Sequence, residues 1–538
     1  MKTMMRNDVV AANQITEIAS DNQEFILLII ISSIIAFSFV FKGFATGDSI
    51  LYAHGIEAIW KNGLRELPDN FNGEIAFGYY IVLYLLYGVF HSHYALSAIM
   101  NYFNALSSIF MIGFFYFLVI SLGFNKRIAL FSCFTVLIAP AIWLLSHYGH
   151  PGMPCLAFFV GSLLVLAHLD FNDLAKISQK TKLLIFTIFS YLALIMRLDI
   201  LLSFGAYFGI LYYKNKFNNY NICRLLGVIL VALSLVFVSR YVLLNYLINP
   251  DGGSFAYHLG RKLYGAYIPQ EIIKNLLYWA LGISPFILVI ALLGIISFGI
   301  TSSLTVLFFS WVTPYVVFFP FHNMDLPRLA APAILICALI AMAFLDQKFS
   351  SASLKTVAMT LALVVAQLVS LGIYYPIQAI VPFRVKFQDR SLTSVPLGFL
   401  LTDHYYRQHV TLAREKVAEQ IAHERNANIM IVDLASSTCY YDYYIRKYRD
   451  IVELTDNKIV TKENTFYFII PDNNLSIDHP ISRLLHRTDI SVDKIHVTPF
   501  AGEYPTDHNK LFLKKSDITP LLDYEVSMMD MRRKIIAK

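Results

Sequence analysis

Two carboxylates stand where acid–base chemistry could take place, in a long polar loop that follows the first apolar segment. Asp48 lies shortly beyond that segment, and Glu74 lies just before an aromatic run that starts at Gly78. A positioned carboxylate can accept a proton from a hydroxyl group in a transition state. Asp48 and Glu74 are therefore candidate catalytic residues. Asp48 could also cap a helix that follows it, and the two roles are compatible.

Two histidines occupy a short polar turn between later apolar segments. His147 and His150 are three residues apart, beside Gly149 and Pro151. Imidazole nitrogens bind divalent metal ions, and Asp48 could supply a third ligand. The spacing therefore allows a divalent metal site. Ordinary hydrogen bonding at a membrane interface explains the same residues, so both interpretations stay open.

Four basic residues from distant segments share one predicted side of the membrane: Arg197, Arg261, Lys262 and Arg328. Arg and Lys bind phosphate groups, and Arg does so with a planar fork of donors. Arg197 could instead pair with Asp199, and Arg328 could simply extend its charge to the level of the headgroups. Their common placement favours a site for a phosphate-bearing lipid in the outer leaflet.

The chain that positions these residues divides into a membrane part and a soluble tail. Residues 384–538 include 43 charged residues among 155, close to the share in soluble proteins, whereas the first 383 residues include only 37. We therefore predict a cytoplasmic segment over 1–24, a transmembrane domain over 25–380 and an extracytoplasmic domain over 381–538. The net charge of +6 is small and scattered, which excludes nucleic acid as a partner.

The membrane part is predicted to cross the bilayer eleven times, with the N-terminus inside and the tail outside. A span needs about 20 mostly apolar residues, so the shorter apolar stretch 77–90 is assigned to the outer surface, within an outer loop over 42–97. Lys and Arg are more frequent in the predicted inner segments, as the positive-inside rule requires. The predicted spans are 25–41, 98–122, 128–146, 153–169, 183–196, 200–213, 225–247, 275–299, 303–321, 329–345 and 355–376.

The tail is predicted to be a small α/β domain, because strands alternate with helices. The predicted strands are 428–434, 451–454, 465–471 and 494–499, and the predicted helices are 437–448 and 481–486. The first strand is followed by Leu434-Ala435-Ser436-Ser437, which lacks a glycine-rich phosphate-binding turn. We therefore expect a non-catalytic domain that covers the active site or guides the acceptor.

The ordered set of these features resembles the GT-C superfamily of membrane glycosyltransferases. Within it, the pattern is most similar to protein O-mannosyltransferases and lipid A aminoarabinose transferases. No single motif is specific, but their order along residues 1–380 is. The features are Gly47-Asp48 after the first span, the aromatic segment from Gly78-Tyr79-Tyr80 to Phe90-His91-Ser92, the basic turn Phe124-Asn125-Lys126-Arg127, the tip Met196-Arg197-Leu198-Asp199, and Pro327-Arg328 before a span.

The resemblance implies an inverting transfer of a sugar from a polyprenyl-phosphate-linked donor to a lipid, glycan or protein acceptor. In that reading Asp48 acts as general base, and Arg197, Arg261, Lys262 and Arg328 hold the donor phosphate. The implied location is a bacterial inner membrane, with the active site on the periplasmic side. The chain departs from many relatives in carrying His147 and His150, not a second acidic residue, in the second outer turn. The Trp-Trp-Asp signature is absent, which argues against en bloc oligosaccharide transfer.

Two alternatives share the same predicted topology. A polymerase or ligase of lipid-linked polysaccharides would use outer arginines and histidines in place of Asp48. A lipid or solute transporter would be expected to place ionisable groups at mid-membrane, but no Asp or Glu lies deep within a predicted span. The odd number of predicted spans and the absence of an internal repeat also favour an enzyme.

Overall fold

The computed structural model describes residues 23–44, 47–62, 73–243, 280, 282–318 and 331–379, together with seven short strands further along the chain. The chain divides into two compact units. The first comprises residues 1–41 and 55–404, and the second comprises 42–54 and 405–538. The first unit contains the helical bundle, and the second contains most of the strands.

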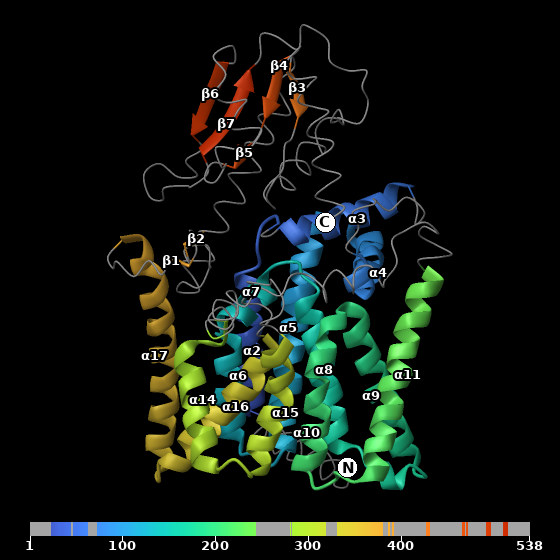
Figure 1. The fold of residues 1–538 in the computed structure, drawn as a ribbon, viewed down its shortest axis with the longest axis vertical. Helices are drawn as coiled ribbons and strands as arrows, with labels where there is room; N and C mark the ends of the chain where they lie inside the picture. The colour runs from blue at the N-terminus through green and yellow to red at the C-terminus, as the bar shows by residue number, and fades with distance from the viewer. Residues whose placement is uncertain are drawn as a thin grey trace, which may run out of the picture. The chain divides into compact units, whose positions relative to one another are not determined.

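Helices that follow one another in the sequence also neighbour one another in the first half of the bundle (Figure 1). α5 (Leu96–Ser121) packs against α2 (Gln23–Ser38) and α8 (Gly152–His168). α8 packs in turn against α9 (Ile177–Met196), and α9 packs against α11 (Asn219–Leu243). α5 thus lies at the centre of this half, where its buried face contacts several partners.

The second half of the bundle is organised around α16 (Ala331–Lys348), whose residues from Ala331 to Ala343 are all buried. α16 packs against α14 (Pro285–Phe298) and α15 (Ser303–Phe318). The remaining helices here are α17 (Ala352–Ala379), against α14, and α10 (Gly205–Tyr213), against α15. α16 therefore links two ends of the bundle that are about 27 Å apart at 1.5 Å per residue.

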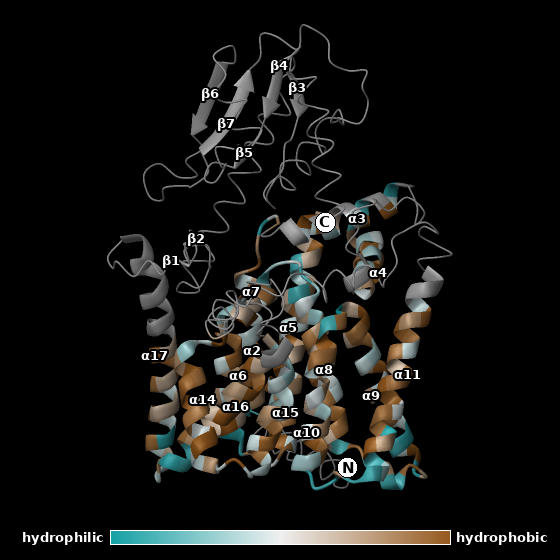
Figure 2. Cartoon of the chain, viewed as in Figure 1, coloured by the Kyte–Doolittle hydropathy of each residue, from teal (hydrophilic) through white to brown (hydrophobic). Residues whose placement is uncertain are grey.

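The outward surface of the bundle is apolar. Figure 2 shows hydrophobic residues along α9, α11 and α14, and hydrophilic residues gathered where these helices end. Large side chains such as Leu230 and Ile296 are 62% and 75% exposed, which would be costly in water but suits contact with lipid. The chain is therefore an integral membrane protein.

Four of the described helices are long and apolar enough to cross a membrane: Leu96–Ser121, Ile177–Met196, Asn219–Ser239 and Ala331–Lys348. A bent pair of helices makes a fifth candidate span. Several shorter apolar helices accompany them, including α2, α8 and α14. The total of eleven spans stays a prediction, because parts of four predicted spans, 225–247, 275–299, 303–321 and 329–345, fall outside the described residues.

The predicted span over 128–146 is observed as two helices, between which the chain bends by 68°. α6 (Lys126–Leu137) ends before Ala139, and α7 (Pro140–His147) begins at a proline. Proline lacks an amide hydrogen and disfavours helical backbone in the residue before it, so it starts a new helix more readily than it continues one. The bend directs the end of α7 toward the turn that carries His150.

Polar contacts connect turns of the bundle at each of its two ends. At one end Asp346 contacts Arg127 at 3.9 Å and Lys355 at 2.9 Å, which joins α6, α16 and α17. At the other end Arg197 contacts His150, which joins the turn after α9 to the turn before α8. The turns predicted to lie inside thus meet at one end, and those predicted to lie outside meet at the other.

The helix that Asp48 could cap after the first span is observed as α3 (Gly47–Asn62). The helix begins one residue before Asp48, so Asp48 belongs to its first turn and does not precede it; acidic residues are favoured there by the helix dipole. Trp60 near its end packs against Tyr84 and Tyr87 of α4 (Gly73–Phe90), with ring centroids 5.7 and 5.5 Å apart. The predicted apolar stretch 77–90 is therefore helical.

The second unit contains two groups of strands. β3 (Ala427–Met430) pairs in parallel with β4 (Thr465–Phe468), and a second, antiparallel sheet has the order β5-β7-β6. Its strands are β5 (Ile470–Pro471), β6 (Ser491–His496) and β7 (Asn509–Lys514). A two-residue hairpin in the first unit pairs β1 (Lys386–Phe387) with β2 (Arg390–Ser391). The predicted strands 428–434, 465–471 and 494–499 overlap observed strands, but β7 was not foreseen.

The α/β character of the tail stays a prediction. Its predicted helices 437–448 and 481–486, and the strand 451–454, lie outside the described residues.

Candidate functional site

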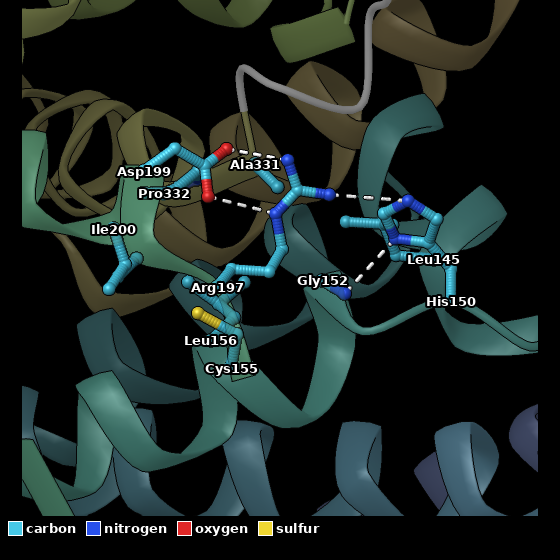
Figure 3. A pocket seen from close by; sticks show the side chains of 10 residues that line it. All are labelled: Leu145, His150, Gly152, Cys155, Leu156, Arg197, Asp199, Ile200, Ala331 and Pro332. Atoms are coloured by element: carbon cyan, nitrogen blue, oxygen red, sulfur yellow. Dashed lines mark hydrogen bonds and ion pairs between the residues drawn. The ribbon is translucent and has the colours of Figure 1, made fainter. Parts of the chain in front are cut away.

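A pocket opens at the end of the bundle where the predicted outer turns meet (Figure 3). Its open space, including the mouth, is about 380 Å³. Three elements converge on it: the turn between α7 and α8, the turn after α9, and the first residues of α16. The polar lining comes from His150, Arg197 and Asp199, and the apolar lining includes Leu145, Leu156, Ile200, Ala331 and Pro332. This combination of apolar walls with few polar groups is typical of ligand sites.

Arg197 is held in a planar fork by a carboxylate two residues further along the chain. Its Nε and Nη2 donate to the two carboxylate oxygens of Asp199 at 2.9 and 2.6 Å. The local fold explains this proximity: Arg197 is extended, with φ −155° and ψ 122°, and ends α9, while Asp199 lies in the 3-10 helix Leu198–Phe204. The alternative in which Arg197 pairs with Asp199 is therefore confirmed. It leaves the Nη1 side of the guanidinium facing the pocket.

The imidazole of His150 lies between two hydrogen-bond donors. The Gly152 amide donates to Nδ1 at 3.0 Å, and Nη1 of Arg197 lies 3.2 Å from Nε2. A neutral imidazole has one N–H group and only one accepting nitrogen. When Nδ1 accepts from Gly152, Nε2 carries the hydrogen and points a donor at another donor. An oxyanion placed against both groups would accept from Nε2 and from the guanidinium together, so the geometry suits a phosphate oxygen.

Two buried asparagines of α5 hold the turn that carries His150. Nδ2 of Asn104 donates to the carbonyl oxygens of Leu145, Tyr148 and His150 at 3.0, 2.9 and 2.6 Å. The hydroxyl of Tyr79 in α4 donates to Oδ1 of the same asparagine at 3.2 Å. Since Asn104 is fully buried, these bonds are costly to lose and fix the backbone of the turn.

Asn101 supports the same turn from one helical turn away. Its Oδ1 accepts from the Gly149 amide at 2.6 Å, and its Nδ2 donates to the carbonyl of Phe41 at 2.9 Å. Gly149 packs so closely on α5 that an added Cβ would lie 2.6 Å from Cβ of Met100. The two asparagines thus connect α5, the end of the first helical segment and the His150 turn into one polar unit.

His147 lies in different surroundings. Its Nδ1 is 2.7 Å from the carbonyl oxygen of Trp143, and its Nε2 is 3.3 Å from that of Ile35. Its ring is 1% exposed and packs on the Trp143 ring. A metal ligand needs a nitrogen lone pair directed at the ion, whereas both nitrogens here face acceptors. The geometry of His147 therefore does not favour the predicted metal site, and no cluster of three or more metal-binding side chains occurs among the described residues.

Only some of the predicted site residues are among those that the structure describes. Arg197 and His150 are brought together in the pocket. The backbone of Asp48 lies in the first turn of α3 and that of Glu74 in the first turn of α4, but their side chains lie outside the described residues. Arg261, Lys262 and Arg328 also lie outside the described residues.

Asn101 and Asn104 are the residues that sequence reasoning missed. Two amide side chains three residues apart share one face of a helix, and their occurrence in an otherwise apolar span is unusual. That pattern could have marked the face of α5 that meets a polar turn. Which turn it holds depends on the packing of α5 against α7 and α8, and spacing alone does not contain that information.

Comparison with known proteins places the fold. No protein-family model matches the sequence, and no curated protein matches it. Among solved structures, ArnT from Cupriavidus metallidurans bound to undecaprenyl phosphate is similar with a TM-score of 0.56 and 13% identity, over 91% of this chain and 98% of that chain. The apo state of ArnT matches with a TM-score of 0.53 and 14% identity, over 92% and 99%. The likeness extends over nearly the whole of both chains, so this chain shares the fold of ArnT.

Proposed function

We propose that this protein is a glycosyltransferase that moves a sugar from a polyprenyl-phosphate-linked donor to a hydroxyl group of a lipid, glycan or protein acceptor. The observation that carries the proposal is the pocket in which Nη1 of Arg197 lies 3.2 Å from Nε2 of His150, beside apolar walls. The similarity in fold to ArnT, solved with undecaprenyl phosphate, supports a lipid phosphate as the ligand. The proposed location of the site is the periplasmic side of a bacterial inner membrane.

The positive charge in the pocket suits a leaving phosphate group, which keeps the electron pair of the broken bond to the sugar. Asp199 neutralises part of the Arg197 charge but also fixes the plane of the guanidinium, so that Nη1 is preorganised. Arg328 precedes Ala331, which lines the pocket, by three residues and is proposed to add positive charge there. Arg261 and Lys262 are proposed as further phosphate ligands. Together these groups would stabilise the negative charge on the leaving lipid phosphate.

The apolar walls supply the second requirement, which is a place for the lipid. Leu145, Leu156 and Ile200 line the pocket beside the polar groups. The first isoprene units next to the phosphate could pack on such side chains, because burial of apolar surface is favourable at about 25 cal/mol per Å². The pocket thus offers one polar side for the phosphate and one apolar side for the chain attached to it.

The proposed reaction is a displacement at the anomeric carbon. The acceptor oxygen forms a bond to that carbon while the bond from the carbon to the phosphate oxygen breaks, which inverts the configuration. The acceptor proton passes to the Asp48 carboxylate, and the electron pair of the broken bond stays on the polyprenyl phosphate. Glu74 is proposed as a second carboxylate that orients the acceptor. No step of this reaction passes through a metal ion.

Binding of undecaprenyl phosphate to the purified full-length protein tests the phosphate site. We expect Arg197→Gln to weaken binding by roughly 30-fold or more, because truncating one partner of a desolvated charge pair costs about 2–5 kcal/mol. Arg127→Gln is the matched control, since Arg127 lies at the other end of the bundle, where it pairs with Asp346. Equal affinity of wild type and Arg197→Gln would overturn the assignment of this pocket.

Sugar transfer itself separates an enzyme from a transporter. Wild-type protein in liposomes should release polyprenyl phosphate from a polyprenyl-phosphate sugar when acceptor lipid is present, and Asp48→Asn should not. A transporter would move the labelled donor across the bilayer in both variants without releasing sugar. The latter result would exclude the proposed function.

The tail over 381–538 is proposed to be a non-catalytic α/β domain that guides the acceptor. Photo-crosslinking of a nucleotide sugar to the full-length protein tests this role. Specific labelling of residues within 381–538 would contradict it.

A further inference from the structure

Three lysines converge on the C-terminal ends of two helices, at the end of the bundle that lies away from the pocket. Nζ of Lys182 donates to the carbonyl of His168 at 3.1 Å, and Nζ of Lys216 donates to that of Leu169 at 2.8 Å. Nζ of Lys214 donates to the carbonyl of Ser121, where α5 ends. Lys182, Lys214 and Lys216 are called the lysine triad below. They come from α9 and from the turn after α10.

The turn after α10 is built to place two of these lysines. Asn215 adopts the left-handed conformation, with φ 54°, which asparagine tolerates better than most residues. The amide of Lys216 then bonds back to the carbonyl of Leu211 at 2.8 Å. Lys214 and Lys216 therefore stand on either side of a tight reversal and reach different helix ends, Ser121 and Leu169.

Helix capping accounts for only part of this arrangement. Carbonyl groups at a helix C-terminus carry partial negative charge and attract cations. Each ammonium group has three N–H donors, and each lysine of the triad uses one of them on a described carbonyl. The remaining donors stay available for a ligand. Capping also does not require three like charges to gather around one side chain, His168, whose Nε2 lies 2.7 Å from Oγ of Ser121.

The triad is crowded with positive charge. Burial lowers the pKa of Lys216; Asp170 raises it, and the charges of Lys214 and Lys182 lower it. Arg224 adds a fourth cation nearby, since it donates to the carbonyl of Phe171, two residues beyond Leu169. A bound anion would relieve this repulsion, as a cluster of cations in a phosphate site does.

Exposed aromatic side chains surround the same turn. Tyr212, Phe217 and Tyr220 are 40%, 49% and 48% exposed, and the rings of Tyr212 and Phe217 meet edge to face at 5.9 Å. The guanidinium of Arg224 lies 3.9 Å from the ring centre of Tyr220. Figure 2 shows this end of α9 and α11 as hydrophilic, directly beside the hydrophobic lengths of both helices. Aromatic rings at such a boundary are typical of the headgroup level of a membrane.

We propose that the lysine triad and Arg224 form a binding site for the phosphate of an anionic phospholipid, such as phosphatidylglycerol, in the leaflet away from the pocket. The donors would contact the phosphate, and the exposed rings would lie beside the glycerol and the upper acyl chains. This site does not depend on the proposed sugar transfer, because it involves other residues at another end of the bundle.

Native mass spectrometry of the full-length protein tests the site. The detergent-purified protein is titrated with dioleoylphosphatidylglycerol or dioleoylphosphatidylcholine, and the bound lipid is counted. We expect tighter binding of phosphatidylglycerol and a loss of roughly fivefold in its affinity for each lysine replaced in K182Q, K214Q and K216Q, the size expected for one basic residue at an anionic surface. The triple variant Lys182→Arg, Lys214→Arg and Lys216→Arg keeps the charges and should bind like wild type.

Matched controls separate a site from general attraction. Lys126, Lys180 and Lys348 are exposed lysines outside the triad, so replacing all three by Gln changes the net charge equally and should leave the affinity unchanged. Glycerol phosphate at millimolar concentration should displace the lipid only partly, whereas complete displacement would indicate a site for a free phosphate ester. Equal affinity for the two lipids, or equal losses in triad and control variants, would overturn the proposal. The single variants keep the test valid if a triple variant fails to fold.

Discussion

Nη1 of Arg197 lies 3.2 Å from Nε2 of His150, in a geometry in which the guanidinium directs a hydrogen at the imidazole while the Gly152 amide directs another at Nδ1. An imidazolium cannot accept either hydrogen, and a neutral ring can accept only one. With Nδ1 accepting from Gly152, Nε2 carries the hydrogen, and one anionic oxygen could accept from both Nε2 and Nη1. His147, three residues earlier, shows the opposite arrangement, because both of its nitrogens face carbonyl oxygens.

His150 should contribute to phosphate binding without being required for folding. We expect His150→Leu to weaken the binding of undecaprenyl phosphate by roughly tenfold or more, because hydrogen bonds to charged groups contribute about 1.5–3 kcal/mol each. His150→Gln keeps an N–H donor and should retain part of the affinity. Native mass spectrometry or microscale thermophoresis of the full-length protein measures both variants.

The neighbouring histidine provides the control for that experiment. His147→Leu removes bonds to Trp143 and Ile35 inside the bundle, so it should lower the thermal midpoint and leave lipid affinity nearly unchanged. If His147→Leu lost lipid affinity and His150→Leu kept it, the phosphate would be bound near His147, and the assignment to His150 would be wrong.

Asn104 should act as a positioning residue for the His150 turn. In Asn104→Asp the Nδ2 donor that serves three carbonyls is replaced by an oxygen, which leaves those carbonyls unsatisfied and adds a buried charge. A loss of at least about 1–3 kcal/mol in unfolding free energy is expected, the cost of one buried unsatisfied polar group. A differential scanning fluorimetry series would measure the shift in midpoint.

A second readout distinguishes positioning from plain stability. Ser108→Ala removes a buried hydroxyl of the same helix that donates to the carbonyl of Ala105 in the preceding turn, so it should have a small effect on both midpoint and affinity. At temperatures where Asn104→Asp is still folded, its affinity for undecaprenyl phosphate should be several-fold lower than wild type. Wild-type affinity in the folded variant would show that the turn keeps its shape without Asn104.

The sequence predicts a helical membrane protein and places Arg197 and His150 on the same side of the membrane. Apolar length marks the membrane part, and the order of the predicted spans puts the turns of Arg197 and His150 on one side, in agreement with their contact. Each span is long enough to cross the membrane once, so alternate turns lie at the same end of the bundle. The order of the turns along the chain is therefore enough to predict which turns share an end.

The parts that the sequence does not predict depend on packing between distant helices. The bend at Pro140 was not expected, because a proline at the start of a helix and a proline within one look alike in an apolar run. The role of Asn104 was missed because its partners are backbone carbonyls of another segment. The antiparallel partner β7 (Asn509–Lys514) was also not predicted, since its pairing joins segments from different parts of the tail.

A close approach between α10 and α15 should make the bundle sensitive to one added methyl group. A Cβ at Gly205 would lie 2.0 Å from the carbonyl oxygen of Ser310, so the two helices must separate in Gly205→Ala. Overpacking of this kind costs typically about 1–3 kcal/mol, and we expect a lower thermal midpoint. Gly227→Ala is the matched control, because nothing lies within 4 Å of the added Cβ, and alanine should be neutral or stabilise α11 by up to about 1 kcal/mol. Equal midpoints of the two variants would indicate that α10 and α15 are not in such close contact.

Asp48 is the residue whose substitution tests the chemistry most directly. Its backbone lies in the first turn of α3. Asp48→Asn keeps the size of the side chain but cannot take a proton from the acceptor hydroxyl. A positioned general base contributes typically ~10²–10⁴-fold, so turnover should fall at least about a hundredfold. Binding of undecaprenyl phosphate and the thermal midpoint should stay close to wild type.

Glu57 provides the control for Asp48, because it is a second carboxylate of the same helix, in its middle turns. Glu57→Gln removes an equal charge, and we expect it to transfer sugar at nearly the wild-type rate. The comparison uses release of polyprenyl phosphate from a labelled polyprenyl-phosphate sugar, followed under single-turnover conditions so that chemistry is separated from product release. Near wild-type transfer by Asp48→Asn would limit Asp48 to a role in the helix. The alternative that uses His150 and the arginines, as in a polysaccharide polymerase or ligase, would then explain the site better.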